Sequence, residues 1–215
     1  MPNPTLADAL STGLAGLDAQ LGGGVPPGSV HLLLGEPMNA LELFTYHFAA
    51  SNPKSGIKSQ FVTTSSTEKA VKAGIQAIGG DAGKATVTSL AGGKSWALPD
   101  PTPGYRYVLD SFSEVALHVG WEKAYDRLLE LRDAVRKGDG NLLITAVPDL
   151  HNPRELALLK MWADGVLELG FDRQGFGLYP YLKVTKMRGV PDSARFLLFK
   201  ETERGLFMES TRRVF

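Results

Sequence analysis

The sequence contains no cysteine, and its four histidines are scattered. Without cysteine the chain can form no disulfide, use no thiol as a nucleophile and offer no thiolate to a metal ion. The histidines follow no metal-ligand spacing and have no serine or carboxylate partner pattern beside them in the sequence; they are His31, His47, His118 and His151. We therefore expect no metal site and assign the histidines no role.

An excess of charge of one sign and a long apolar run are also lacking. The 23 basic and 23 acidic residues cancel, so no field of the whole protein favours nucleic acid or an anionic membrane. Residues 1–12 lack a basic start followed by an apolar run, and no stretch approaches the roughly 20 apolar residues that span a bilayer. We expect a cytoplasmic protein without membrane insertion, for which nucleic-acid binding is a minor hypothesis.

The chain instead alternates strand-like and helix-like segments. Its 215 residues, 43% of them hydrophobic, suffice for one large core, so we expect a single domain over 1–215 with residues 1–10 as a lead-in. Strands separated by single helices predict an α/β fold with a mostly parallel central sheet flanked by helices. The hairpin texture from Leu178 onward predicts an antiparallel C-terminal extension.

Local patterns place these elements. Hydrophobic runs predict strands over 30–34, 60–63, 85–89, 105–110, 141–147, 165–169, 181–186, 195–200 and 206–209. Helical spacing predicts helices over 40–50, 70–78 and 121–135, and a further helix that begins near Pro153. The S-x-x-E pattern from Ser65 to Glu68 predicts a capping box before the second of these helices.

The most informative segment is a phosphate-loop position that lacks phosphate-binding residues. The first strand runs into Gly35-Glu36-Pro37-Met38-Asn39-Ala40-Leu41-Glu42 and then a helix. Against the GxxxxGK(S/T) template only Gly35 fits, because Ala40, Leu41 and Glu42 replace the second glycine, the lysine and the hydroxyl that binds Mg²⁺. Glu36 and Glu42 also place two carboxylates where a polyphosphate would lie. We expect no catalytic residue and no cofactor, and ATP with Mg²⁺ is disfavoured.

Several motifs resemble those of KaiC-like and RadA-like ATPases of the RecA superfamily. The lead-in from Ser11 to Ser29 is similar to theirs, and Leu109–Ser113 resembles the Walker B strand. Residues 163–169 (ADGVLEL) resemble an ADGVIEL strand, and residues 186–189 (KMRG) match a KMRG element. These pieces fall in family order across residues 11–210, so the resemblance implies a RecA-like P-loop NTPase fold over nearly the whole chain.

The resemblance assigns roles to a few further residues. It makes Asp110, followed by Ser111, the Walker B-like carboxylate that holds Mg²⁺; alternatively, Asp110 makes local turn hydrogen bonds. It implies that Lys186 and Arg188 reach across a subunit boundary to the γ-phosphate of a neighbour; alternatively, they are a solvated hairpin end. Where active members carry a pair of water-orienting glutamates, this chain has Thr63-Thr64-Ser65-Ser66.

These departures favour one functional hypothesis over another. The first is a degenerate, non-catalytic pseudo-ATPase that acts as a regulatory or scaffold subunit, an oligomer with itself or with an active KaiC/RecA-like paralogue. The alternative is a weak ATP-binding or trans-completed ATPase subunit in signalling or in DNA recombination and repair. Positioning, charge neutralisation and water activation supply nearly all of phosphoryl-transfer catalysis, and the chain lacks the residues for all three: the lysine and hydroxyl of the loop and the glutamate pair after the second strand.

Overall fold

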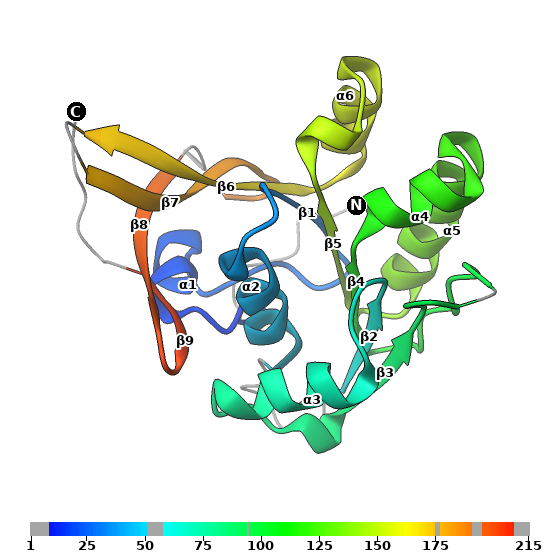
Figure 1. The fold of residues 1–215 in the computed structure, drawn as a ribbon, viewed down its shortest axis with the longest axis horizontal. Helices are drawn as coiled ribbons and strands as arrows, with labels where there is room; N and C mark the ends of the chain where they lie inside the picture. Colours follow the sequence, from blue (N-terminus) through cyan, green and yellow to red (C-terminus); the bar gives the residue numbers. More distant parts are fainter. Residues whose placement is uncertain (1–8, 51–57, 94, 175–176, 191–194, 209–215) are drawn as a thin grey trace.

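The computed structural model describes residues 9–50, 58–93, 95–174, 177–190 and 195–208, which form a mixed sheet with helices on both faces (Figure 1). The strands lie in the order β3-β2-β4-β5-β1-β6-β7-β8-β9. In chain order they are β1 Val30–Leu34, β2 Ser59–Thr63, β3 Ala85–Ser89, β4 Arg106–Asp110, β5 Asn141–Ala146, β6 Gly165–Gln174, β7 Gly177–Met187, β8 Arg195–Thr202 and β9 Gly205–Met208.

The sheet is parallel in its first part and antiparallel at its end. β1 pairs in parallel with β5 and β6, β2 with β3 and β4, and β4 with β5. From β6 onward, each strand pairs antiparallel with the next. β1, β2 and β5 are buried at every position, as expected for strands covered on both faces. The predicted α/β fold with an antiparallel C-terminal extension is confirmed.

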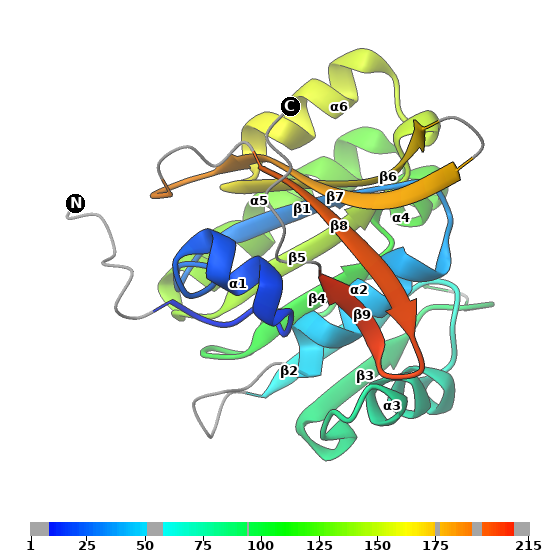
Figure 2. The same ribbon diagram turned by 90° about the vertical axis from the view of Figure 1, so that its left-hand side faces the viewer.

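Helices cover the two faces of the sheet with separate hydrophobic clusters. One cluster packs α1 Ala15–Leu21, α2 Asn39–Ala50 and α3 Glu68–Ala77 together with β9. The other packs α4 Phe112–Val119, α5 Trp121–Lys137 and α6 Pro153–Trp162 on the opposite face. Figure 2 shows β8 and β9 turning away from β6 and β7, so that β9 lies against α1 and α2. In the described part of the chain, no helix is long and apolar enough to cross a membrane.

Two short helices were not predicted from the sequence. α1 has no side-chain cap at its N-cap residue Leu14, and it ends at Gly22, which adopts a left-handed conformation. Its buried residues Leu17 and Leu21, together with hydrogen bonds from Thr12 to Asp18, hold it in place. α4 begins at Phe112, inside the segment that resembles the Walker B strand, and Ser111 is its N-cap. β6 and β7 are also longer than predicted because they pair residue by residue out to Gln174 and Gly177.

The predicted capping box is wrong. α3 begins at Glu68, and its N-cap is Thr67, whose Oγ1 accepts a hydrogen bond from the Ala70 N–H at 3.2 Å. Ser65 lies in the turn before the cap and is exposed. The chain therefore enters α3 two residues later than the pattern suggests.

Replacing the cap should weaken α3 measurably. We expect Thr67→Ala to lower the free energy of unfolding by about 1 kcal/mol, since it leaves the Ala70 N–H without its side-chain acceptor. Ser65→Ala serves as the matched control and should change stability by less than about 0.5 kcal/mol. Urea denaturation checks both variants. A larger loss of unfolding free energy in Ser65→Ala than in Thr67→Ala would support the capping box and contradict this prediction.

Candidate functional site

The parallel strands bring the predicted site residues together at one edge of the sheet. We call this the carboxyl edge, because β1, β2, β4 and β5 end there, and we call the opposite edge, where they begin, the amino edge. β1 leads into Gly35, β4 ends at Asp110, and β2 ends at Thr63. The loop from Gly35 to Glu42 runs from β1 into α2, so it occupies the place that the template assigns to a phosphate loop.

Apolar side chains fill the interior of the loop. Ala40 is fully buried, and Leu41 is 7% exposed and belongs to the same hydrophobic cluster as α2. Leu41 Cδ1 lies so close to Gly35 that a Cβ atom placed there would meet it at 3.2 Å. Met38 packs against the same cluster, whereas Glu36 and Pro37 are exposed. The position of the phosphate-binding lysine thus carries a side chain directed into the core.

Glu42 takes the position of the Mg²⁺-binding hydroxyl and is exposed. Its Oε1 accepts a hydrogen bond from the Tyr46 hydroxyl one helical turn later. Burial and this carboxylate both raise the pKa of Tyr46, so the phenol stays a donor. The hydrogen bond holds Glu42 on the α2 surface at the start of the helix.

Asp110 is bound across the sheet and not to its sequence neighbours. Its Oδ1 accepts a hydrogen bond from Thr145 Oγ1 of β5 at 2.6 Å. Its backbone oxygen accepts from Thr64 N at 2.7 Å and Thr64 Oγ1 at 3.0 Å, and Thr64 Oγ1 in turn accepts from Ser111 N at 2.8 Å. The predicted local turn hydrogen bonds of the Asp110 side chain are therefore replaced by a contact to β5.

The carboxyl edge carries unneutralised negative charge. Desolvation by burial raises the pKa of Asp110 to about 6, and the negative charges of Glu42 and Glu114 add to the shift, while the Thr145 hydrogen bond opposes it. Within the described residues, none of Glu36, Glu42, Asp110 and Glu114 forms an ion pair with a lysine or arginine. The described residues also contain no group of three or more histidines and carboxylates arranged to hold a metal ion.

The residues in place of the water-orienting glutamates serve structural contacts. Thr63 Oγ1 accepts from Ser66 N at 3.1 Å, and the Ser66 carbonyl accepts from Ser89 Oγ at 2.6 Å. With Thr64 bound to the end of β4, this segment fastens β2 to both neighbouring strands. None of its side chains is a carboxylate that can act as a base.

A cleft of about 560 Å³ opens beside the loop. It lies between the end of β1, α6 and the β6–β7 hairpin, and of the loop only Gly35 and Glu36 reach it. Its charged lining mixes signs: Glu36, Asp149 and Glu168 face it with Lys160 and Arg173. Lys160 is already paired with Glu168 at 2.8 Å. The cleft therefore adjoins the loop without being centred on it.

His151 has serine and carboxylate partners that the sequence did not reveal. His151 Nε2 lies 2.8 Å from Ser113 Oγ, and its Nδ1 lies 3.5 Å from Glu155 Oε2. Ser113 is fully buried, and its Oγ also accepts from Val147 N at 2.9 Å. Burial lowers the pKa of His151. A serine without access to solvent cannot meet a substrate, so this chain of contacts joins α4 to the start of α6. The sequence did not reveal this contact because Ser113 and His151 are 38 positions apart in the chain.

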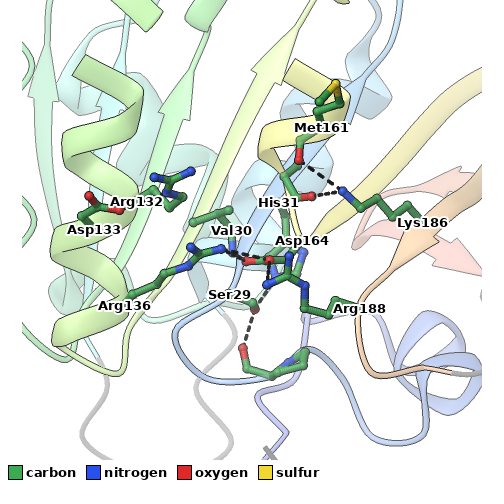
Figure 3. Close-up of polar contacts among 12 residues, drawn as sticks. Ser29, Val30, His31, Arg132, Asp133, Arg136, Met161, Asp164, Lys186 and Arg188 are labelled. Carbon is green, nitrogen blue, oxygen red and sulfur yellow. Dashed lines mark hydrogen bonds and ion pairs between the residues drawn. The ribbon is translucent and has the colours of Figure 1, made fainter. Parts of the chain in front are cut away.

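Lys186 and Arg188 lie at the amino edge, far from the loop of their own chain. The Lys186 ammonium donates to the carbonyls of Lys160, Met161 and Ala163 at the end of α6. Arg188 pairs with Asp164 at 2.9 Å, beside Arg136 of α5 (Figure 3). Both predicted basic residues thus have partners within the chain, although the Arg188 side chain remains 66% exposed. The structure brings Gly35–Glu42 and Asp110 together and separates them from this pair.

Comparisons with known proteins identify a family and a fold. The model of a family of unknown function, DUF7125, matches residues 9–200. No curated protein matches the chain. A solved structure of a KaiC-like protein from the hyperthermophilic archaeon Pyrococcus horikoshii OT3 is similar, with a TM-score of 0.74 and 20% identity over 94% of this chain and 98% of that one. At this identity the similarity shows a shared fold.

Removing the charge of Asp110 should stabilise the protein at neutral pH. Because its pKa rises from 3.8 to about 6 on folding, the folded state binds the extra proton between these values, and stability falls as the pH rises through this window. Asp110→Asn keeps an acceptor for Thr145, so we expect it to raise the free energy of unfolding by up to about 3 kcal/mol at pH 7. The gain should vanish near pH 4. Urea denaturation at both pH values checks this, and a gain independent of pH would contradict it.

Proposed function

We propose that this chain, which belongs to DUF7125, a family of unknown function, is a non-catalytic protein built on the fold of KaiC-like ATPases. In this proposal it acts as a regulatory or scaffold subunit through assembly with itself or with an active relative of the same fold. The observation that carries the proposal is the burial of Leu41 in the loop, where an ATPase needs a lysine.

The charge of the carboxyl edge supports the same conclusion. A polyphosphate placed at the loop would face Glu36 and Glu42, and the loop from Gly35 to Glu42 contains no lysine or arginine to neutralise it. Two like charges about 4 Å apart repel by roughly 4 kcal/mol at the effective dielectric of a protein surface. Carboxylates at this position therefore oppose the binding of a polyphosphate.

The replacement of the water-orienting glutamates by Thr63-Thr64-Ser65-Ser66 supports the non-catalytic part. Hydrolysis needs a group within hydrogen-bond reach of the attacking water. Thr63 Oγ1 accepts from the Ser66 N–H in the turn after β2, and Thr64 Oγ1 donates to the Asp110 carbonyl at the end of β4. Asp110 lies at the end of β4, and its Oδ1 accepts a hydrogen bond from Thr145. We propose that no group at this edge activates water.

A second candidate is a weak ATP-binding or trans-completed ATPase subunit. The observation that favours it is the 560 Å³ cleft beside Gly35, which has room for a small organic molecule. Its lining contains Glu36 and Asp149 but also Arg173, so charge alone does not exclude an anion there. Direct binding measurements separate this candidate from the first.

Titration calorimetry with Mg²⁺-ATP and Mg²⁺-ADP tests the proposal. We expect no saturable heat with the purified chain at ligand concentrations that would reveal a dissociation constant of about 1 mM, which is about −4 kcal/mol. The reason is the loss of the loop lysine together with the two added carboxylates. Saturable binding to the unmodified chain would overturn the non-catalytic proposal and favour the second candidate.

Restoring the missing groups gives the complementary test. The double variant Leu41→Lys with Glu42→Thr returns the ammonium and the hydroxyl, and we expect it to bind Mg²⁺-ATP measurably more tightly than the unmodified chain. Gln76→Lys, which adds a cation on the exposed side of α3, is the control for charge alone and should remain without binding. Equal gains in both would show that net charge, not the loop, controls affinity.

A further inference from the structure

The cleft of about 560 Å³ beside the loop has an apolar wall and an acidic inner end. Its volume lies within the range of sites for small organic molecules, which are mostly apolar with a few polar groups that fix the orientation of the ligand. The apolar lining includes Leu34 of β1, Leu156 of α6, Leu169 and Phe171 of β6, and Leu178 and Tyr181 of β7. The polar groups of the cleft therefore decide which class of ligand it takes.

Tyr181 gives the apolar wall a fixed aromatic ring. Tyr181 pairs with Gly170 across the β6–β7 hairpin, and a Cβ atom placed at Gly170 would meet the Tyr181 Cζ at 2.7 Å. The ring also stacks on that of Phe196 in β8, with the two centroids 4.3 Å apart. Phe171 and Leu178, which line the same cleft, are 47% and 58% exposed. The wall thus combines a held aromatic ring with accessible hydrocarbon.

Two carboxylates lie at the inner end of the cleft, next to the sheet. Glu36 follows the end of β1 by two residues and Asp149 follows the end of β5 by three, and these parallel neighbours end together at Leu34 and Ala146. Both side chains line the cleft, and both residues are exposed. Within the described residues, neither forms an ion pair with a lysine or an arginine. Two negative charges are therefore open to a ligand there.

The basic residues of the cleft do not neutralise its inner end. Lys160 is paired with Glu168 at 2.8 Å, so this pair is neutral. Glu168 is the residue of β6 that pairs with Leu34 at the end of β1. Arg173 comes five residues later in β6, about 17 Å farther along the strand. It therefore lies on the outer part of the hairpin, and the inner end keeps its negative charge.

We infer that this cleft binds an organic cation with an aromatic body. Its ammonium group lies between Glu36 and Asp149, where each carboxylate can accept a charge-assisted hydrogen bond. Its ring lies along Phe171, Leu178 and Tyr181, and removal of this hydrocarbon from water supplies the apolar part of the affinity. An aromatic amine is the chemical class that joins both features in one small molecule.

This inference does not rest on the non-catalytic role, and it is opposite to nucleotide binding in the same cleft. The polyphosphate of a nucleotide would be repelled by Glu36 and Asp149, whereas an ammonium group is attracted by both. Leu41 and Asp110 are not among the residues that line the cleft. The state of the degenerate phosphate loop therefore does not decide whether the cleft takes an amine.

Tryptamine and indole-3-propionate test the inference as a matched pair. Both contain an indole ring, but at neutral pH the first carries an ammonium group and the second a carboxylate. We expect tryptamine to shift the amide signals of the cleft residues in ¹H–¹⁵N NMR spectra of the full chain, with a dissociation constant of about 1 mM. Indole-3-propionate should bind at least about tenfold more weakly, because two carboxylates favour the first probe and oppose the second.

Variants separate the charges from the apolar wall. Glu36→Gln and Asp149→Asn should each weaken tryptamine binding about fivefold and strengthen that of indole-3-propionate. Leu178→Ser should weaken both probes alike, and because Leu178 is 58% exposed this replacement leaves the core unchanged. Asp126→Asn removes an exposed carboxylate of α5 outside the cleft, so it is the control and should bind both probes like the unmodified chain.

Three results would overturn the inference: no shifts at up to about 10 mM tryptamine, shifts confined to residues outside the cleft, or equal or tighter binding of indole-3-propionate. Shifts of the cleft signals on addition of Mg²⁺-ATP would also contradict it and would support the second candidate function. Its failure differs from that of the proposed function. A chain that binds neither ATP nor tryptamine leaves the non-catalytic proposal intact, whereas ATP binding at the loop together with tryptamine binding in the cleft removes that proposal alone.

Discussion

Asp164 joins the parallel and antiparallel parts of this fold. Its backbone pairs with Val30 at the start of β1 and with Arg188 after β7, and its side chain binds Val30 again along with two arginines. One buried residue thereby aligns the central strand, the end of α5 and the C-terminal strands. A buried carboxylate is tolerated only when every oxygen is satisfied, and here both are. This junction therefore holds together the amino edge of the sheet.

Much of the architecture could be predicted because it depends on local patterns. Alternating strands and helices, the buried run of β1 and the loop composition at Ala40 to Glu42 all lie within short windows of sequence. The features that the sequence did not predict depend on contacts between segments that are far apart in the chain. The Asp110 side chain binds Thr145, and His151 contacts Ser113, and in each case the two residues are more than 30 positions apart in the sequence. The sequence did not predict α1, because this helix is short and is stabilised by packing and by Asp18, not by an N-cap side chain.

At the candidate site, too, some features could be predicted from the sequence and others depend on the folded structure. Sequence alone identifies that the loop lacks its lysine and hydroxyl, since those are absences of residue type. It does not tell whether a leucine at that position points to solvent or into the core; the packing of Leu41 against Gly35 and the α2 cluster decides this. Nor does it tell that Lys186 rests on the end of α6, because a hairpin strand and a helix terminus meet there only in the folded chain.

The packing of Leu41 has a thermodynamic consequence for a protein with this loop. A domain that binds a nucleotide only when folded gains stability in proportion to the logarithm of nucleotide concentration, so its folded population follows the energy supply of the cell. Under the proposed function this coupling is broken, because the loop contributes to the core by burying hydrocarbon and not by holding phosphate. The abundance of the folded chain would then be independent of ATP and ADP, and it would remain constant while nucleotide-binding relatives respond.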